Sequence, residues 1–226
     1  MSIHLTQHEQ EHIIAHGTAQ DALKFAHEIQ SMPHADWFDM KRLEEVVLLS
    51  GNSGCAYRFA RDVNGADIAA LQAVVLEVGY PYHAYQFARD VDGADVQALS
   101  QVVIAQGTLG ELYDFAGHVR GANIRTIEQA IINGSAIDHA STACSFAINI
   151  KGANIKLCEQ AVLKHGNPYI VADFARDIPE ADIETLKKAA LRSGDSEAKS
   201  NWDSQMRARS VVLEECNQSL GMGVSS

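Results

Sequence analysis

Residues 59–67 read Phe-Ala-Arg-Asp-Val-Asn-Gly-Ala-Asp, and residues 87–95 repeat the phrase as Phe-Ala-Arg-Asp-Val-Asp-Gly-Ala-Asp. The Phe-Ala pair occurs six times, with successive gaps of 34, 28, 28, 31 and 28 residues. The copies begin at Phe25, Phe59, Phe87, Phe115, Phe146 and Phe174. A period of this length indicates a stacked-repeat architecture, in which each unit buries its apolar face only against its neighbours.

Each copy predicts two helices joined by a short turn. In residues 52–79, Asn52 can cap a first helix and Asp67 can cap a second. The second helix is expected to end at Gly79, where a left-handed C-cap needs a residue without Cβ. Pro81 stands in the first turn of the next copy, where its missing N–H costs nothing.

Two further positions, both in the second helices, are apolar in every copy, and we expect them in the core together with the phenylalanines. The first position holds Leu43, Leu71, Leu99, Ile127, Cys158 and Leu186, and the second holds Val47, Val75, Val103, Ile131, Val162 and Ala190. Cys158 is therefore expected to be a packing residue rather than a reactive thiol. The four cysteines form no CxxC pair, which favours reduced thiols.

The two best-preserved copies, residues 59–67 and 87–95, resemble the short FARDV-x-GAD arrays of bacterial and phage proteins and, more broadly, the HEAT-like family of bihelical α-solenoids. The resemblance covers most of the chain, although the units are shorter than typical HEAT units. It implies an all-α fold, a right-handed α-solenoid superhelix of about six bihelical repeats with capping helices at both ends. Because such solenoids usually serve as binding scaffolds, it also implies protein binding.

We expect one repeat domain over residues 1–194, beginning with a cap helix at about residues 4–16. Residues 195–226 are expected to form a C-terminal capping or interaction helix and a flexible tail. The apolar stripe of that helix includes Trp202 and Met206, residue types that are enriched at interfaces, so both are candidate binding residues. Because the last repeat is the nearer surface to cover, we expect a monomer rather than a homodimer.

The chain of 226 residues carries a net charge of −11. Residues 1–51 contain 3 basic and 8 acidic groups, residues 52–134 contain 5 and 9, and residues 135–226 contain 10 and 12. An acidic surface repels phosphate backbones, which disfavours direct nucleic-acid binding. The N-terminus lacks the apolar core of a signal peptide and no apolar run reaches ~18 residues, so we expect a cytoplasmic protein that does not bind membranes.

Tyr57, Tyr85 and Tyr113 each lie two residues before a repeat phenylalanine, which places them ~160° from it, at the rim of the exposed helix face. Arg61 and Arg89 follow the first two tyrosines by four residues, where side chains on a helix touch. Tyrosine and arginine anchor many interfaces, so these five residues are candidates for protein binding. Alternatively, the tyrosines cover gaps between helices and the arginines form weak surface ion pairs.

The second helices of the central repeats also present small, uncharged residues on the side away from the predicted core. These residues are Ala69, Ala70, Gln72, Ala73, Gln97, Ala98, Ser100 and Gln101. They are expected either to line a concave groove for a peptide or helix or to pack closely between helices, and the sequence does not separate the two.

His4, His8, His12 and His16 recur at intervals of four, a spacing at which two histidines can share a metal ion. Each step drifts by ~40° around the helix, however, so the row does not converge on one point and we predict no metal site. No catalytic motif or phosphate loop occurs, and we predict no cofactor. The expected function is that of a non-enzymatic protein-binding scaffold or adaptor. Two alternatives stay open, an acidic inhibitor of a nucleic-acid-binding partner, such as a phage counter-defence protein or DNA mimic, and a HEAT-like enzyme.

Overall fold

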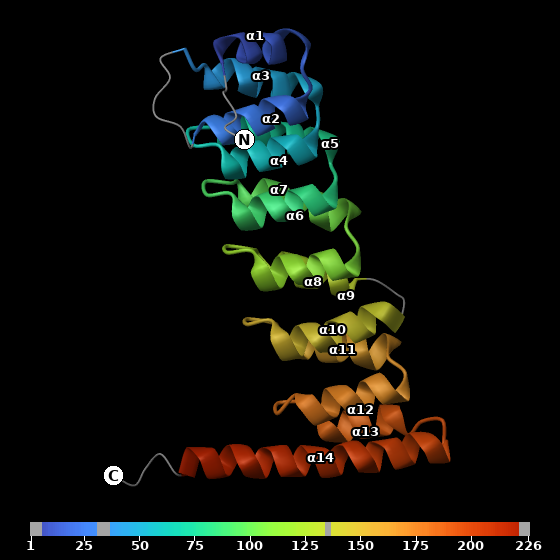
Figure 1. The fold of residues 1–226 in the computed structure, drawn as a ribbon. Coiled ribbons are helices and arrows are strands. Elements are labelled where there is room, and N and C mark those ends of the chain that lie inside the picture. Colours follow the sequence, from blue (N-terminus) through green and yellow to red (C-terminus); the bar gives the residue numbers. More distant parts are fainter. Residues whose placement is uncertain (1–5, 31–36, 134–136, 222–226) are drawn as a thin grey trace. The chain divides into compact units, whose positions relative to one another are not determined.

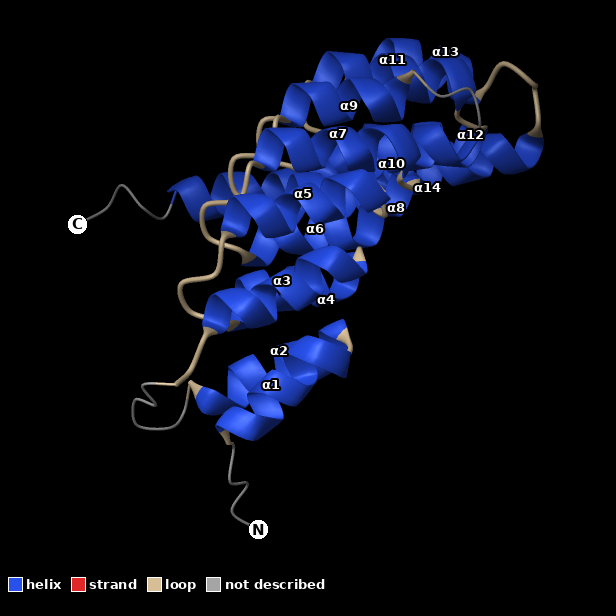
Figure 2. Ribbon diagram, turned by 90° about the horizontal axis from the view of Figure 1, so that it is seen from above, coloured by secondary structure: helices blue, strands red, loops and turns tan. Residues whose placement is uncertain are grey.

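The computed structural model describes residues 6–30, 37–133 and 137–221. The regular structure of these residues consists of fourteen helices without a strand (Figures 1 and 2), which confirms the all-α prediction. The chain divides into two compact units, Met1–Ala122 (unit 1) and Asn123–Ser226 (unit 2). The expected domain boundary at residue 194 stays a prediction.

Unit 1 contains four first helices and four second helices of the repeat. The first helices are α2 (Ala19–Ile29), α4 (Ser53–Asp62), α6 (Pro81–Asp90) and α8 (Leu109–His118). The second helices are α1 (Gln7–His16), α3 (Met40–Ser50), α5 (Ile68–Val78) and α7 (Val96–Gln106). Each first helix also packs on the next one, α2 on α4, α4 on α6 and α6 on α8, so adjacent repeats contact one another through both helices.

Unit 2 continues the alternation and ends with a long helix. Its members are α9 (Ile124–Ile132), α10 (Ile137–Asn149), α11 (Ile155–His165), α12 (Pro168–Asp177), α13 (Ile183–Ala190) and α14 (Ser196–Gly221). Helices α10 and α12 pack on one another as the first helices of unit 1 do. The expected tail residues 222–226 lie outside the described residues.

The predicted helix boundaries follow from local hydrogen bonds. The side chain of Asn52 accepts from the N–H of Cys55 at 3.0 Å and caps α4, and that of Asp67 caps α5 in the same way. Gly79 ends α5 with a φ of 66°, the left-handed conformation that glycine adopts without steric cost. Pro81 occupies the first turn of α6. These caps confirm the two-helix reading of the repeat.

The core contains the residues that the repeat pattern predicts. Five of the six repeat phenylalanines are completely buried, and Phe25 is 4% exposed. The two apolar positions of the second helices are buried in every copy, including Cys158 and Ala190. The buried phenylalanine of each repeat packs against the neighbouring repeat, because a single helix pair has too little apolar surface to bury it alone.

A glutamate or glutamine, buried in every case except the half-buried Glu159, links each second helix to the next one within a unit. Its side-chain oxygen accepts from the backbone N–H of the residue that caps the following second helix. The pairs are Gln10 with Asp39 (3.0 Å), Glu44 with Asp67 (2.6 Å), Gln72 with Asp95 (2.7 Å), Glu128 with Asn154 (2.6 Å) and Glu159 with Asp182 (2.9 Å). The bond satisfies a backbone donor at the seam between repeats and sets their register.

Candidate protein-binding surfaces

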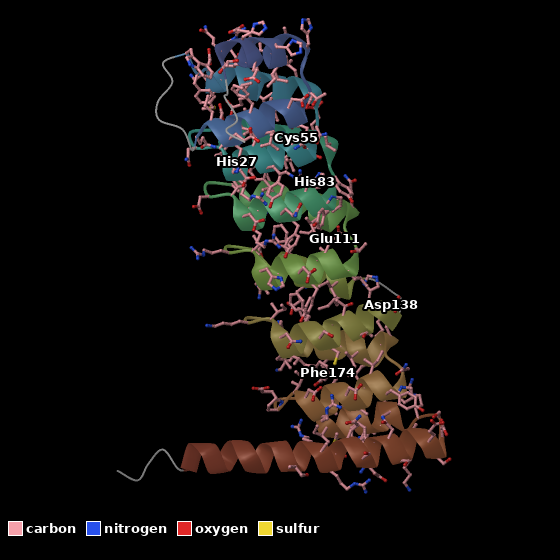
Figure 3. The ribbon with its side chains drawn as sticks, viewed as in Figure 1. His27, Cys55, His83, Glu111, Asp138 and Phe174 are labelled. Carbon is pink, nitrogen blue, oxygen red and sulfur yellow. The ribbon has the colours of Figure 1, made fainter. Side chains whose placement is uncertain are left out.

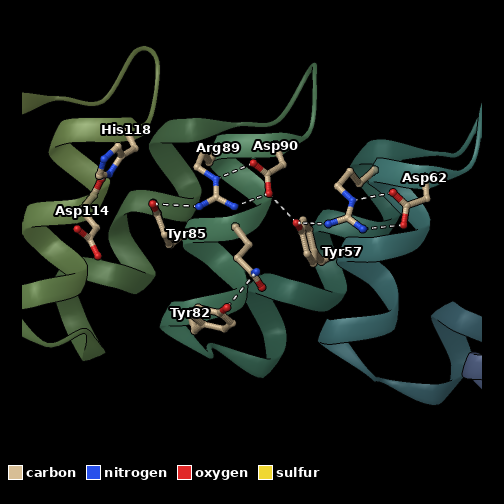
Figure 4. A network of polar contacts seen from close by, with 10 residues as sticks. Tyr57, Asp62, Tyr82, Tyr85, Arg89, Asp90, Asp114 and His118 are labelled. Atoms are coloured by element: carbon tan, nitrogen blue, oxygen red, sulfur yellow. Dashed lines mark hydrogen bonds and ion pairs between the residues drawn. The ribbon is translucent and has the colours of Figure 1, made fainter.

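The predicted tyrosine–arginine pairs form on α4 and α6 (Figure 4). Arg61 Nη1 donates to the hydroxyl of Tyr57 at 2.8 Å, and the guanidinium carbon lies 5.0 Å from the centre of the tyrosine ring. Arg89 contacts Tyr85 in the same way, with a hydrogen bond of 3.2 Å and the same distance to the ring. The i,i+4 spacing therefore predicted both contacts correctly.

The expectation that these tyrosines lie at an exposed rim is wrong. Tyr57 is 3% exposed and Tyr85 is 8% exposed. Each is covered by the next first helix, because the hydroxyl of Tyr57 donates to Asp90 Oδ2 of α6 at 2.6 Å and the ring of Tyr85 lies 6.3 Å from that of Phe115 in α8. The side of a first helix opposite its phenylalanine is thus an inter-repeat contact.

Aspartates complete the network and leave little unpaired charge on it. Asp62 and Asp90 each accept two hydrogen bonds, at 2.6 and 2.8 Å, from the arginine that precedes them. These bonds hold the pKa of Asp90 below its usual value, with a smaller contribution in the same direction from the hydroxyl of Tyr57. The side chains of Arg61 and Arg89 are 41% and 38% exposed, so the arginines rather than the tyrosines reach the surface.

The third tyrosine has no equivalent pair. Tyr113 is half-buried, and Gly117 and His118 stand where the earlier repeats have arginine and aspartate. His118 bonds to the carbonyl oxygen of Asp114 on its own helix at 3.0 Å. Among the described residues the tyrosine–arginine pair is therefore confined to α4 and α6, whereas the arginine–aspartate contact recurs in α12 between Arg176 and Asp177.

The C-terminal helix covers the end of its own unit. Helix α14 packs on α12 and α13, Trp202 is 2% exposed and Met206 is half-buried. Arg209 donates to the carbonyl oxygens of Ala175, Ile178 and Pro179, the last two at 2.7 Å. The apolar stripe is thus covered in the same chain, as expected, over the residues whose side chains are described.

An exposed apolar surface that the sequence reading missed lies on unit 1. It lies along the side of unit 1 where the chain passes from a second helix to the next first helix. Cys55 and His83, labelled in Figure 3, lie near the starts of two of these first helices. Leu49, in the last turn of α3, is 89% exposed. It borders a groove of about 560 Å³ whose walls include Ile14, Ala19, Val46, Leu49, Asn52 and Cys55. Groove volumes of this size accommodate side chains of a partner.

Three aromatic rings lie at the start of α6, in the repeat after the groove, and one of them bonds to the segment that follows the groove wall. Tyr80 and Tyr82 are 51% and 46% exposed, and the ring of His83 lies 4.8 Å from that of Tyr80 and 6.0 Å from that of Tyr82. His83 Nδ1 is 2.7 Å from the hydroxyl of Ser53, which follows Asn52 of the groove wall. We call Leu49, Tyr80, Tyr82 and His83 the edge patch.

The central second helices present only part of the small-residue face that the sequence predicts. Ala69, Ala73, Gln97 and Gln101 are exposed. Gln72 and Ser100 are instead buried, which agrees for these two residues with the alternative of close packing between helices. Gln72 is buried because its side-chain oxygen accepts a hydrogen bond from the backbone N–H of Asp95 in the next repeat.

His12, His139 and Cys158, residue types that often carry chemistry, make local contacts in the structure. The rings of His12 and His16 lie 5.4 Å apart, and the described residues contain no group of three metal-ligating side chains arranged around one point, while His4 lies outside them. His139 bonds to the carbonyl oxygen of Ile131 at 2.7 Å. Burial and the adjacent Glu128 carboxylate raise the pKa of Cys158 to about 12, which keeps this thiol protonated at neutral pH.

Comparison with protein-family models, with curated proteins and with solved structures gives no match for this chain. Among the described residues, no helix combines the length and apolar character that a membrane crossing requires.

Proposed function

We propose that this chain is a non-enzymatic protein-binding scaffold. Its bihelical repeats would continue as a right-handed α-solenoid, and its edge patch would contact the partner. A solenoid suits this role because each repeat adds a rigid helix pair and one segment of a continuous surface.

The observation that carries the proposal is the identity of residue 80. The N-caps of the other first helices of unit 1 are Thr18, Asn52 and Thr108, and each accepts a backbone hydrogen bond through its side chain. Tyr80 occupies the same position in α6 and makes no capping bond, although its ring contacts that of His83. Losing such a cap typically costs about 0.5–2 kcal/mol. A residue that gives up a cap while half of its aromatic side chain stays in solvent indicates selection for something other than stability.

The chemistry of the patch defines the expected partner. Exposed tyrosines and a leucine beside a groove favour a partner segment with large apolar side chains, because such anchors dominate interface energies. Residues 1–122 carry 16 acidic and 7 basic residues, a net charge of −9, so basic residues should flank that segment. Arg61 and Arg89 stay secondary candidates because their guanidinium groups reach the surface.

The test compares four full-length proteins in affinity capture from an extract of the source organism, with quantitative mass spectrometry. They are the wild type, the patch variant Tyr80→Asn/Tyr82→Ser, the variant Arg61→Gln/Arg89→Gln, and the control Ala69→Ser/Ala73→Ser on the exposed face of α5. We expect one protein to be enriched by the wild type and the control, and at least about tenfold less by the patch variant, which is the effect of losing about 1.4 kcal/mol.

Stability separates this result from simple unfolding. Because asparagine restores the missing cap, Tyr80→Asn alone should raise the free energy of unfolding by about 0.5–1 kcal/mol while it weakens capture. Equal capture by all four proteins, or loss only with the arginine variant, would refute the edge patch as the binding site. A wild type that enriches no protein above the resin without bait would contradict the scaffold role.

The concentration of acidic residues in unit 1 favours a second candidate, the inhibitor of a nucleic-acid-binding protein. An acidic surface that replaces nucleic acid on a basic partner binds mainly through charge, so its complex should dissociate when the ionic strength rises from about 0.15 to 0.5 M. A captured partner that survives this change would contradict the inhibitor and agree with the apolar contact.

A further inference from the structure

Unit 2 contains a cavity of about 540 Å³ between the end of α11, the start of α12 and α13. Three cations line it: Lys164 from the last turn of α11, Lys188 from α13, and Arg192 from the turn after α13. Leu163, Pro168 and Val171 supply apolar wall. The cavity is separate from the edge patch, which belongs to unit 1.

The charge of this cavity is unbalanced. Its lining includes no carboxylate, and within the described residues none of the three cationic side chains makes a hydrogen bond or ion pair. Asp182 is near enough to Lys188 to feel its charge, but its pKa is lowered chiefly by hydrogen bonds from Thr185, so this carboxylate serves to cap α13.

The other described cations of unit 2 are either paired, as Arg176 and Arg209 are, or single exposed side chains, as Lys156 and Lys199 are, whereas three cations share the lining of this one cavity. Arg176 contacts Asp173 and Asp177, and Arg209 donates to three carbonyl oxygens. The helix dipole favours a cation near a helix C-terminus, which explains Lys164 or Lys188 when each is considered alone. It does not account for cations from two different helices lining one cavity without a counterion, in a chain whose net charge is −11.

We propose that this cavity binds a small organic phosphate that carries at least two negative charges. Three adjacent cations match the charge of a di- or triphosphate, and arginine suits phosphate because its planar fork can donate two hydrogen bonds at once. The apolar wall provides contact for the organic part of the ligand. The volume lies within the range of small-molecule sites and is bounded by three helices, which distinguishes it from a flat surface for nucleic acid.

The test uses calorimetry on the full-length protein at about 0.15 M ionic strength, with ATP, pyrophosphate and adenosine as probes. We expect saturable binding of ATP, weaker binding of pyrophosphate because it lacks the organic part, and no binding of adenosine because it lacks the charge. The variant Lys188→Gln/Arg192→Gln should weaken ATP binding at least tenfold, and Lys164→Gln, on a different helix, at least threefold.

The matched control is Lys156→Gln/Lys199→Gln, which removes the same charge from exposed residues of unit 2 that do not line the cavity. It should change ATP binding less than twofold. Equal weakening by the control pair would show that general charge attraction, and not the cavity, holds the ligand. Absence of saturable ATP binding up to millimolar concentration, or adenosine binding as tight as ATP, would also overturn the proposal.

Discussion

Replacing Tyr57 by phenylalanine should destabilise the protein by about 1.5–2 kcal/mol, because the lost hydroxyl bonds to two charged groups. It donates to Asp90 at 2.6 Å and accepts from Arg61 at 2.8 Å, and Tyr57 is only 3% exposed. Neither ion is left unpaired, since Asp90 keeps its bonds to Arg89 and Arg61 keeps those to Asp62. The cost should therefore stay at the lower end of the range for hydrogen bonds to charged groups.

Tyr85→Phe is the matched control. It removes the same atom from the same position of the next repeat, but the hydroxyl of Tyr85 only accepts from Arg89, at 3.2 Å. His118 stands where the preceding repeat has Asp90. We expect this variant to cost about 0.5–1 kcal/mol, so a difference of about 1 kcal/mol between the two variants measures the bond that joins α4 to α6.

The assay is urea unfolding followed by circular dichroism, with Tyr57→Phe, Asp90→Asn and the double variant forming a cycle. The pKa of Asp90 is lowered from its usual 3.8, chiefly by Arg89, so its stabilising contribution is present above that pH and is lost as the pH falls through the folded-state pKa. The two tyrosine variants should therefore differ at pH 7 and converge in strong acid. Equal costs at pH 7, or a larger cost for Tyr85→Phe, would refute the reasoning.

Three further variants test the rest of the fold. Phe87→Ala, at a fully buried position, should cost about 3–5 kcal/mol in the same assay, and a loss below about 1 kcal/mol would contradict its place in the core. Truncation after Gly194 removes α14 with the buried Trp202 and should lower the melting temperature. Light scattering should show a monomer before and after the truncation. A full-length dimer that becomes a stable monomer would contradict capping in the same chain. Burial raises the pKa of Glu44, so its charge destabilises the fold increasingly as the pH rises above 4.5. Glu44→Gln keeps the bond to the backbone of Asp67, because Gln72 makes the same bond to Asp95. This variant should raise the free energy of unfolding at pH 7 but not at pH 4. An equal effect at both pH values would be evidence against a buried charge.

The sequence predicted the helix pairs, their caps and the core because each depends on residues close in the chain. Asp67 caps the helix that starts directly after it, and a phenylalanine equivalent to Phe87 occurs at the same position of every copy. The link between second helices was missed, although its signal is visible as a glutamate or glutamine directly after the core residue, as in Leu43-Glu44 and Leu71-Gln72. The helical pattern left open whether Gln72 faces solvent or packs between helices, and it did not single out Glu44. Both side chains are buried because they satisfy backbone donors of the next repeat.

The candidate surfaces depended on contacts between repeats, which a local pattern does not contain. The helical angle between Tyr57 and Phe59 was correct, but only the packing of α6 on α4 decided that this side is covered. The anomaly at Tyr80 was present in the sequence as an aromatic residue at a capping position, and the structure showed that its ring is exposed and contacts that of His83.

By itself, then, the sequence determined the all-helical repeat, because hydrophobic period, caps and turns act over one helix pair. Only the tertiary structure decided which polar residues are buried at the seams, which aromatic rings reach solvent, and that cations of α11 and the α13 region line one cavity. The physical reason is that burial and charge balance depend on which helices become neighbours. Similar local sequences have different surroundings when the next repeat differs: the hydroxyl of Tyr57 reaches Asp90 of the next first helix, whereas that of Tyr85 bonds only to Arg89 of its own helix.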